Sequence, residues 1–232
     1  MTELFKLSDG NEVSLPLVCD EALACFMAFP ARVNSLPQLP GGLKPLAVGG
    51  RTICALLLAD YRSMSIGPYR EMVMMAPVRY KGGARPPVTR GVFVHEIAVT
   101  SEVSRLTGME VWGFPKYLAD ITVDQGPGGI KIKMESHKSA FEASLPGWGI
   151  PVPAKAPLPV FTVKEGKLLL SYIKMKGLMY LAPPATAKIK MSSGQSTLSF
   201  LGESKRAVAS GFMKVKKATL GEAVFEDDLP RL

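Results

Sequence analysis

The sequence predicts an α+β domain, mostly of antiparallel strands that curl or close into a β-barrel, with a few short helices. Twenty-two Gly and nineteen Pro are scattered along the 232 residues and divide the chain into many short segments. Most of these segments alternate apolar and polar residues or are short and apolar, which is typical of strands. Hydrophobic residues make up 47% of the chain, enough to bury one core, and a barrel removes exposed strand edges. We therefore expect residues 1–232 to form a single domain.

The first elements are a short helix and three strands. Residues 19–29 contain acidic residues near their start, continue with good helix formers and precede Pro30, so they predict a short helix. Residues 51–60 are apolar and closely preceded by Gly, and they predict a buried strand. Residues 69–80 and 91–100 predict two further strands, and the Gly- and Pro-rich connection between them favours an antiparallel hairpin with a long loop.

A helix interrupts the strand pattern at residues 101–112. This segment begins with Ser, which is followed at a distance by Glu, and places apolar residues at roughly helical spacing. Gly113 and Pro115 end the helix, so Lys116 lies immediately beyond it. The rest of the chain predicts a meander of strands at 118–123, 130–135, 140–145, 160–163, 167–175, 187–191 and 212–215.

The chain carries a formal net charge of +8, and its lysines crowd into residues 131–138 and 205–217. This pattern has two interpretations. A basic cluster suits an anionic partner such as a nucleic acid. However, charged and apolar residues alternate at 130–134 and 214–216, which is typical of half-buried strands with one solvated face. We favour strands and expect no nucleic-acid partner.

Nothing in the sequence predicts export or membrane insertion. The N-terminal residues have no apolar segment of signal-peptide length, and the longest apolar run, 53–59, is far too short to span a bilayer. We expect a cytoplasmic protein without a membrane partner. Its three cysteines, Cys19, Cys25 and Cys54, have apolar neighbours and lack the spacing of a zinc site, so we interpret them as reduced core residues.

Common catalytic and cofactor motifs do not occur in the sequence. The two histidines, His95 and His137, are not spaced to bring two metal ligands together, and we expect no metal site. Phosphate-binding glycine loops and the nucleophile elbow of serine hydrolases are missing too, so we expect neither a nucleotide cofactor nor serine hydrolysis. His95 lies in a predicted strand, where a hydrogen-bonded structural role competes with a catalytic one.

Lys116 is the candidate that remains, because its sequence neighbours are strongly apolar: Trp112, Phe114, Pro115, Tyr117 and Leu118. A buried ammonium loses hydration, which favours the neutral amine that attacks carbonyl groups, provided that no carboxylate pairs tightly with it. The competing interpretation is a surface lysine whose stem lies against its aromatic neighbours while its ammonium reaches water.

Two segments resemble the acetoacetate decarboxylase family. Gly67-Pro68-Tyr69-Arg70-Glu71 is similar to the family's Gly-x-Tyr-x-Glu element, and the segment from Gly108 to Lys116 is similar to its Gly-x-Glu-x4-Pro-Lys element. The order and separation of the two elements also agree with the family. A weaker likeness extends over residues 13–124, whereas the C-terminal half resembles the family in its strand-rich character.

The resemblance implies a cone-like β-barrel, a small keto-acid substrate, no cofactor and assembly into a homo-oligomer. It places Lys116 at the family's Schiff-base lysine and Glu71 at its active-site glutamate, so these are the expected catalytic residues. Two positions depart from the family pattern. The lysine that follows the reactive one is replaced by Tyr117, and residues 7–17 contain no Arg to anchor a substrate carboxylate.

Three functions are compatible with these residues. A Lys116 Schiff base supports loss of carbon dioxide from a 3-oxo acid, with Glu71 moving protons. The same intermediate supports pyruvate-type aldol addition and dehydration, and the missing Arg makes this a serious alternative to decarboxylation. Alternatively, a charged Lys116 belongs to a protein that binds a small carboxylate without catalysis.

We consider five residues for substrate contacts. Four are aromatic and also suit core packing, namely Tyr61, Tyr69, Trp112 and Phe114. The fifth is Glu110, which also suits a structural hydrogen bond at the helix end. Candidate carboxylate anchors, which are equally compatible with ordinary solvated strand residues, are Arg62, Arg70 and Arg79.

Overall fold

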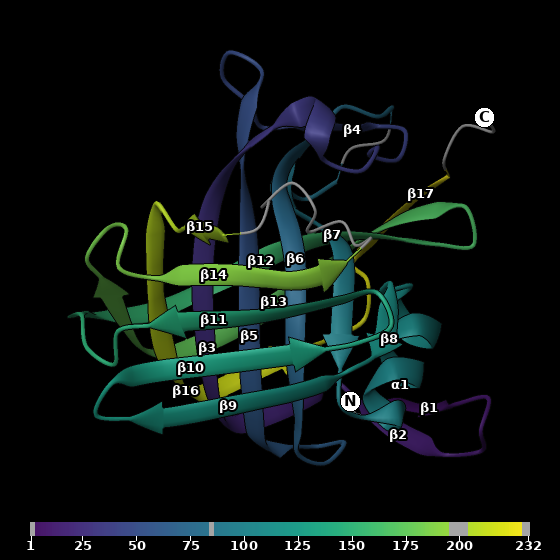
Figure 1. The fold of residues 1–232 in the computed structure, drawn as a ribbon. Helices are drawn as coiled ribbons and strands as arrows, with labels where there is room; N and C mark the ends of the chain where they lie inside the picture. The colour runs from purple at the N-terminus through teal and green to yellow at the C-terminus, as the bar shows by residue number, and fades with distance from the viewer. Residues whose placement is uncertain (1–2, 84–85, 195–203, 229–232) are drawn as a thin grey trace.

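The computed structural model describes residues 3–83, 86–194 and 204–228 and is built mostly of strands (Figure 1). Seven strands close into a barrel in the order β6-β5-β3-β16-β13-β12-β7, and β7 pairs with β6 to complete the ring. These strands are β3 (Leu17–Arg32), β5 (Arg51–Met64), β6 (Tyr69–Tyr80), β7 (Arg90–Val99), β12 (Ile150–Lys164), β13 (Lys167–Ala182) and β16 (Ala209–Leu220). Their pairings are antiparallel except that of β12 with β7, which is parallel. The predicted barrel is confirmed.

A second sheet of five strands covers one side of the barrel. Its order is β15-β14-β11-β10-β9, and Figure 1 shows its strands running crosswise in front of β3, β5 and β6. The strands are β9 (Asp120–Gly126), β10 (Gly129–Glu135), β11 (Ser139–Leu145), β14 (Lys188–Gly194) and β15 (Ser204–Arg206). Apolar residues from both sheets form one core between them, including Met27, Leu56 and Met72 from the barrel and Ile132 and Phe141 from the cover.

Short elements complete the described chain. The helix α1 (Glu102–Trp112) follows β7, and the three-residue strand β8 (Lys116–Leu118) then returns alongside β7. The remaining elements are the hairpin β1 (Glu3–Lys6) and β2 (Glu12–Leu15), the 3-10 turn η1 (Val33–Ser35), and the edge strands β4 (Leu43–Pro45) and β17 (Phe225–Asp228). No helix in the described residues is long and apolar enough to cross a membrane.

The helix predicted at residues 19–29 is wrong, because this segment lies within the long strand β3. Cys19, Ala22 and Ala24 belong to an apolar cluster on the inner side of the barrel, whereas Cys25 and Met27 pack between the barrel and the second sheet. A strand buried on both faces lacks the polar alternation that identifies strands in sequence. Pairing with β5 and β16 therefore overrides the helical propensity of these residues.

Most other predicted elements are confirmed, with shifts at their ends. The strand at 69–80 has the predicted bounds, and it pairs with β7 in the expected antiparallel hairpin. The helix begins at Glu102, and Ser101 caps it by accepting a hydrogen bond from the Ser104 amide. The three cysteines are buried and free. In β10, lysines point outward while Ile130 and Ile132 are buried, as the alternating pattern predicted.

Candidate active site

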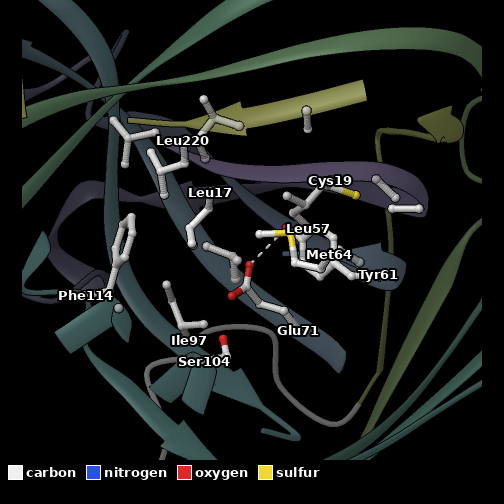
Figure 2. Close-up of a pocket in the computed structure, with 18 of the residues that line it drawn as sticks. Leu17, Cys19, Leu57, Tyr61, Met64, Glu71, Ile97, Ser104, Phe114 and Leu220 are labelled. Carbon is white, nitrogen blue, oxygen red and sulfur yellow. Dashed lines mark hydrogen bonds between the residues drawn. The ribbon is translucent and has the colours of Figure 1, made fainter. Parts of the chain in front are cut away.

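A cavity lies inside the barrel, lined by the seven barrel strands together with α1 and β8. Figure 2 shows Glu71 reaching into it among apolar side chains that include Leu57, Met64 and Ile97, with Ser104 close by. Strand alternation explains how Glu71 enters. In β6, Glu71 and Val73 line the cavity, whereas Met72 and Met74 pack against the second sheet.

The junction between α1 and β8 carries Lys116 into the cavity. Gly113 ends the helix in the left-handed conformation, with φ of 65°, and the Phe114 amide bonds the Gly108 carbonyl at 3.0 Å. The chain then pairs in parallel with β7, which sets Lys116 opposite Ile97. Both residues line the cavity, so the pairing with β7 determines that the amine points inward.

Gly108 provides the space in which the Lys116 side chain lies. A Cβ atom at position 108 would be 2.5 Å from Lys116 Cε and 2.6 Å from its Cδ. A Cβ atom at these distances would force the lysine stem to shift, so the stem passes directly over the helix backbone. The glycine in the family-like element is therefore needed for close approach of the lysine.

Lys116 and Glu71 form a buried ion pair in the cavity. The Lys116 Nζ atom donates to Glu71 Oε2 at 2.9 Å and to Ser104 Oγ at 3.0 Å. The two charged side chains are 7% and 10% exposed. The interpretation of Lys116 as a surface lysine is therefore wrong. The expectation that no carboxylate pairs with the buried amine is wrong as well. Burial favours the neutral forms of both groups, and their mutual attraction favours the charged forms.

Two tyrosines stand beside this pair. The Tyr61 hydroxyl donates to Glu71 Oε1 at 3.4 Å, and the Lys116 Nζ atom lies 5.7 Å from the centre of the Tyr69 ring. Burial first, and then the Glu71 charge, raises the pKa of Tyr61 and of Tyr69 well above the ordinary value. Both phenols therefore stay protonated at neutral pH and can donate hydrogen bonds to an anion or a carbonyl oxygen.

Four of the five residues considered for substrate contact line the cavity, namely Tyr61, Tyr69, Trp112 and Phe114. Trp112 is held by a hydrogen bond of 2.8 Å from its indole nitrogen to the Gly221 carbonyl. Glu110 is not among the lining residues, because it projects from another face of α1 and accepts hydrogen bonds from the Ser8 amide and hydroxyl. Glu110 therefore makes structural hydrogen bonds, which were the alternative to substrate contact. These bonds join α1 to the loop between β1 and β2 and do not fix the end of the helix.

The candidate carboxylate anchors do not reach the cavity. None of Arg62, Arg70 and Arg79 is among the described residues that line it. Arg70 instead pairs with Asp60 at 2.9 Å and donates to the Ile121 carbonyl, and Arg62 also pairs with Asp60. His95 is likewise absent from the lining and lies beside the residues around η1 and β4.

Ser104, Thr107 and Gly108 are lining residues that the sequence analysis missed. They occupy positions i, i+3 and i+4 of α1, and all three are buried. Small and hydroxyl-bearing residues on the buried stripe of a helix that ends just before the lysine are a signal that was available in the sequence. Their size lets the Lys116 amine lie against the helix, with Ser104 as a hydrogen-bond partner.

The Tyr117 side chain, at the position where the family has a second lysine, lies on the other side of the sheet. It packs in the core beneath the second sheet, and its hydroxyl hydrogen-bonds the Glu96 carboxylate. Burial, followed by the Glu96 interaction, raises the pKa of Tyr117. Because adjacent strand residues point to opposite faces, a residue at this position can affect Lys116 through the sheet but does not share its cavity.

Comparisons with known proteins agree with this fold. The family model described as acetoacetate decarboxylase (ADC) matches residues 26–143, about half of the chain, and includes both Glu71 and Lys116. The chain belongs to the acetoacetate decarboxylase family. A curated acetoacetate decarboxylase of Acidiphilium cryptum (strain JF-5) is 42% identical over 57 residues, which cover 25% of this chain and 21% of that relative. This match therefore spans about a fifth of the relative's length.

Solved structures resemble the chain over most of its length. The acetoacetate decarboxylase of Legionella pneumophila has a TM-score of 0.66 at 18% identity, with 91% of this chain and 88% of that one covered. An acetoacetate decarboxylase-like enzyme of Sphingomonas wittichii RW1 has a TM-score of 0.58 at 14% identity, with 94% and 96% covered. The enduracididine biosynthesis enzyme MppR, complexed with pyruvate, has a TM-score of 0.55 at 13% identity, with 93% and 90% covered. At these identities the likeness shows the fold.

Proposed function

We propose that this protein is a cofactor-independent carbon-carbon lyase in which Lys116 forms a Schiff base with a small keto acid. The observation that carries the proposal is the position of the Lys116 amine, inside an apolar cavity and within hydrogen-bonding distance of Glu71 and Ser104. A Schiff-base lysine needs a protein group that can accept and return its protons, and the contact of Glu71 with the amine supports this role for Glu71. The preferred reaction converts a 3-oxo acid to a ketone and carbon dioxide.

The first steps join Lys116 to the substrate. Glu71 takes a proton from the Lys116 ammonium, and the neutral amine adds to the ketone carbon. The resulting carbinolamine loses its hydroxyl group as water, with a proton returned by Glu71, and leaves an iminium. Ser104 and Tyr61 donate or relay hydrogen bonds around these atoms.

The iminium then serves as an electron sink. The bond between the carboxylate and the adjacent carbon breaks, its electron pair forms the enamine, and carbon dioxide leaves. The enamine is protonated on carbon, and water hydrolyses the restored iminium to release the ketone and free Lys116. The apolar cavity assists the cleavage, because a carboxylate is poorly solvated there whereas carbon dioxide is uncharged.

A pyruvate-type aldolase-dehydratase is the second candidate. No arginine lines the cavity in the part of the chain that the structure describes, so the usual cation for holding a carboxylate during decarboxylation is not seen there. The same Lys116 iminium would lose a proton from the neighbouring carbon and add to an aldehyde. The similarity in fold to MppR, which was solved with pyruvate, agrees with this alternative.

Borohydride reduction in the presence of keto acids tests both candidates. We expect a stable adduct on Lys116 by peptide mass spectrometry, lost in Lys116→Met and retained in Lys131→Met, a matched change of an exposed lysine on β10. Release of carbon dioxide distinguishes decarboxylation from aldol chemistry. If acetoacetate, pyruvate and neutral ketones all leave Lys116 unlabelled while binding still occurs, the protein is instead a binder of small carboxylates.

A further inference from the structure

The cavity around Lys116 is lined mostly by apolar side chains. Of the thirty residues that line it, two are charged, and these are Lys116 and Glu71, which already pair with one another. A charge placed elsewhere in the cavity would lack an ionic partner among the described lining residues. Burying an unpaired charge is strongly unfavourable, so the part of the substrate beyond its reacting end is uncharged.

The cavity extends away from Lys116 along a row of small side chains. Glu71 on β6 is paired with Ala59 on β5, and Ala59 is paired with Ala24 on β3. Both alanines line the cavity, and Ala22 and Ala218 add further small side chains to its wall. Beyond this row, β13 and β16 contribute aliphatic side chains such as Met175 and Val215. Methyl groups leave space next to the catalytic pair, and the wall behind them is hydrocarbon.

Two apolar clusters meet around this space. One contains Val73, Ile97 and Phe114, which line the cavity together with Lys116, and the other contains Cys19, Ala24 and Val215. A ligand that reaches from Lys116 to the second cluster contacts hydrocarbon along its length. Each methylene group transferred there from water should tighten binding by roughly fourfold, which corresponds to about 0.8 kcal/mol.

We propose that the substrate carries an apolar alkyl chain of several carbons on its carbonyl carbon, and that this chain lies along the Ala59–Ala24 row. The substrate class is therefore medium-chain 3-oxo acids, with the corresponding methyl ketones as products. This inference rests on the proposed Schiff-base function of Lys116. It adds that the chain beyond the carbonyl, rather than a buried cation, supplies most of the binding free energy.

A series of neutral methyl ketones distinguishes the alkyl-chain inference from the Schiff-base function. These products re-form the iminium on Lys116 without any carboxylate. Acetone, 2-pentanone, 2-heptanone and 2-nonanone are trapped on Lys116 with borohydride, and the half-saturating concentration of each is measured. We expect this concentration to fall along the series, by more than tenfold from acetone to 2-heptanone. Equal half-saturating concentrations across the series, or the lowest value for acetone, would overturn the alkyl-chain inference and leave the Schiff-base function intact.

Binding without covalent chemistry supplies an independent measurement. In Lys116→Met the same ketones should displace a fluorescent alkyl probe in the same order of chain length. Ordered displacement without any labelling of the wild-type protein removes the Schiff base but keeps the apolar-chain site. No displacement by any ketone, together with no labelling, removes both proposals.

Ala24→Leu tests the location of the chain. The added carbons fill the row opposite Ala59, so we expect the advantage of 2-nonanone over acetone in the wild-type protein to shrink by at least tenfold. Ala28→Leu is the matched control on the same strand, at a position that does not line the cavity, and it should keep the wild-type ratio. Thermal unfolding verifies that both variants fold. An unchanged ratio in a folded Ala24→Leu protein would place the chain elsewhere and contradict the proposal.

Discussion

The Lys116–Glu71 pair combines two groups that would each be costly to bury alone. Their contact at 2.9 Å, with Ser104 as a further partner, offsets part of the cost of removing both charges from water. The same contact gives the amine a nearby base, so a proton can move between them without crossing the cavity. The pair therefore links the stability of the barrel interior to the reactivity that we propose.

A double-mutant cycle measures this link. We expect Glu71→Gln and Lys116→Met each to lower the free energy of unfolding by about 3–5 kcal/mol, because each leaves a buried partner without its counter-charge. The double variant should recover much of this loss, since no uncompensated charge remains. Urea unfolding followed by circular dichroism gives the three values. Purely additive losses would show that the pair is not coupled.

Glu71→Gln also tests the proposed proton transfer. The amide keeps the size of the side chain but cannot take the lysine proton, so the rate of ketone trapping should fall by about 10²–10⁴-fold. Lys138→Gln, a change at an exposed position, is the control and should keep the wild-type rate. A Glu71→Gln protein that traps ketones at the wild-type rate would exclude Glu71 as the base.

At the scale of elements, α1 and β8 act together to place the amine. The helix is capped at Ser101, ends at Gly113 and presents Gly108 to the lysine stem, and β8 then sets Lys116 beside Ile97. A side chain at position 113 would lie 2.2 Å from the Val163 carbonyl oxygen, so the end of this helix is fixed against β12 as well. The end of the helix and the pairing of β8 with β7 together determine the direction of Lys116.

Gly108→Ala separates folding from function at this junction. Alanine is the better helix former by about 0.8–1 kcal/mol, and the atoms that it would meet belong to a flexible side chain, so we expect thermal stability to be kept or raised. Displacing the lysine stem should nevertheless reduce the rate of ketone trapping, by roughly 10²-fold for a shift of about 1 Å. Met109→Ala, at the exposed neighbouring position, is the control and should trap at the wild-type rate.

A folded Gly108→Ala protein with full trapping would show that Lys116 has another productive position. The likeness to the family indicated Lys116 and Glu71, the two residues that we propose to be catalytic, together with the glycine element. It did not indicate that Ser104 and Gly108 contact the lysine, because this requires the path of β8 relative to α1. The assignment of Glu110 to the cavity was wrong because its direction depends on the rotation of the helix and on the N-terminal hairpin, where Ser8 binds it.

At the scale of the whole molecule, we expect the stability of the fold to depend on pH through His95. The ring lies on β7 near the segment around η1 and β4, and its Nε2 atom is buried without a hydrogen-bond partner in the described residues. Burial lowers the pKa of His95 to about 4. The hydrogen-bonded histidine considered from the sequence is therefore not observed at this nitrogen.

The sign of the effect follows from this lowered pKa. Between pH 6.5 and pH 4 the unfolded chain binds a proton at His95 that the folded protein does not, so stability is complete above about pH 6.5 and falls on acidification towards pH 4. We expect this group to lower the free energy of unfolding by about 3 kcal/mol on acidification, and this loss should be absent in His95→Phe. Urea unfolding at a series of pH values measures it, with His137→Gln, at an exposed position, as the control. An identical pH dependence in His95→Phe would contradict the assignment.

Cytoplasmic location, a single domain over residues 1–232 and assembly into a homo-oligomer remain predictions. By itself the sequence determined the strand-rich barrel and the α1 boundaries, because alternation and capping are local properties of the chain, and its likeness to the family indicated Lys116 and Glu71 as the candidate catalytic residues. The tertiary structure decided that residues 19–29 are a strand, that Lys116 pairs with Glu71 and that hydrocarbon surrounds them. These features depend on strand register and on burial of both faces of a sheet, which bring together residues far apart in the chain.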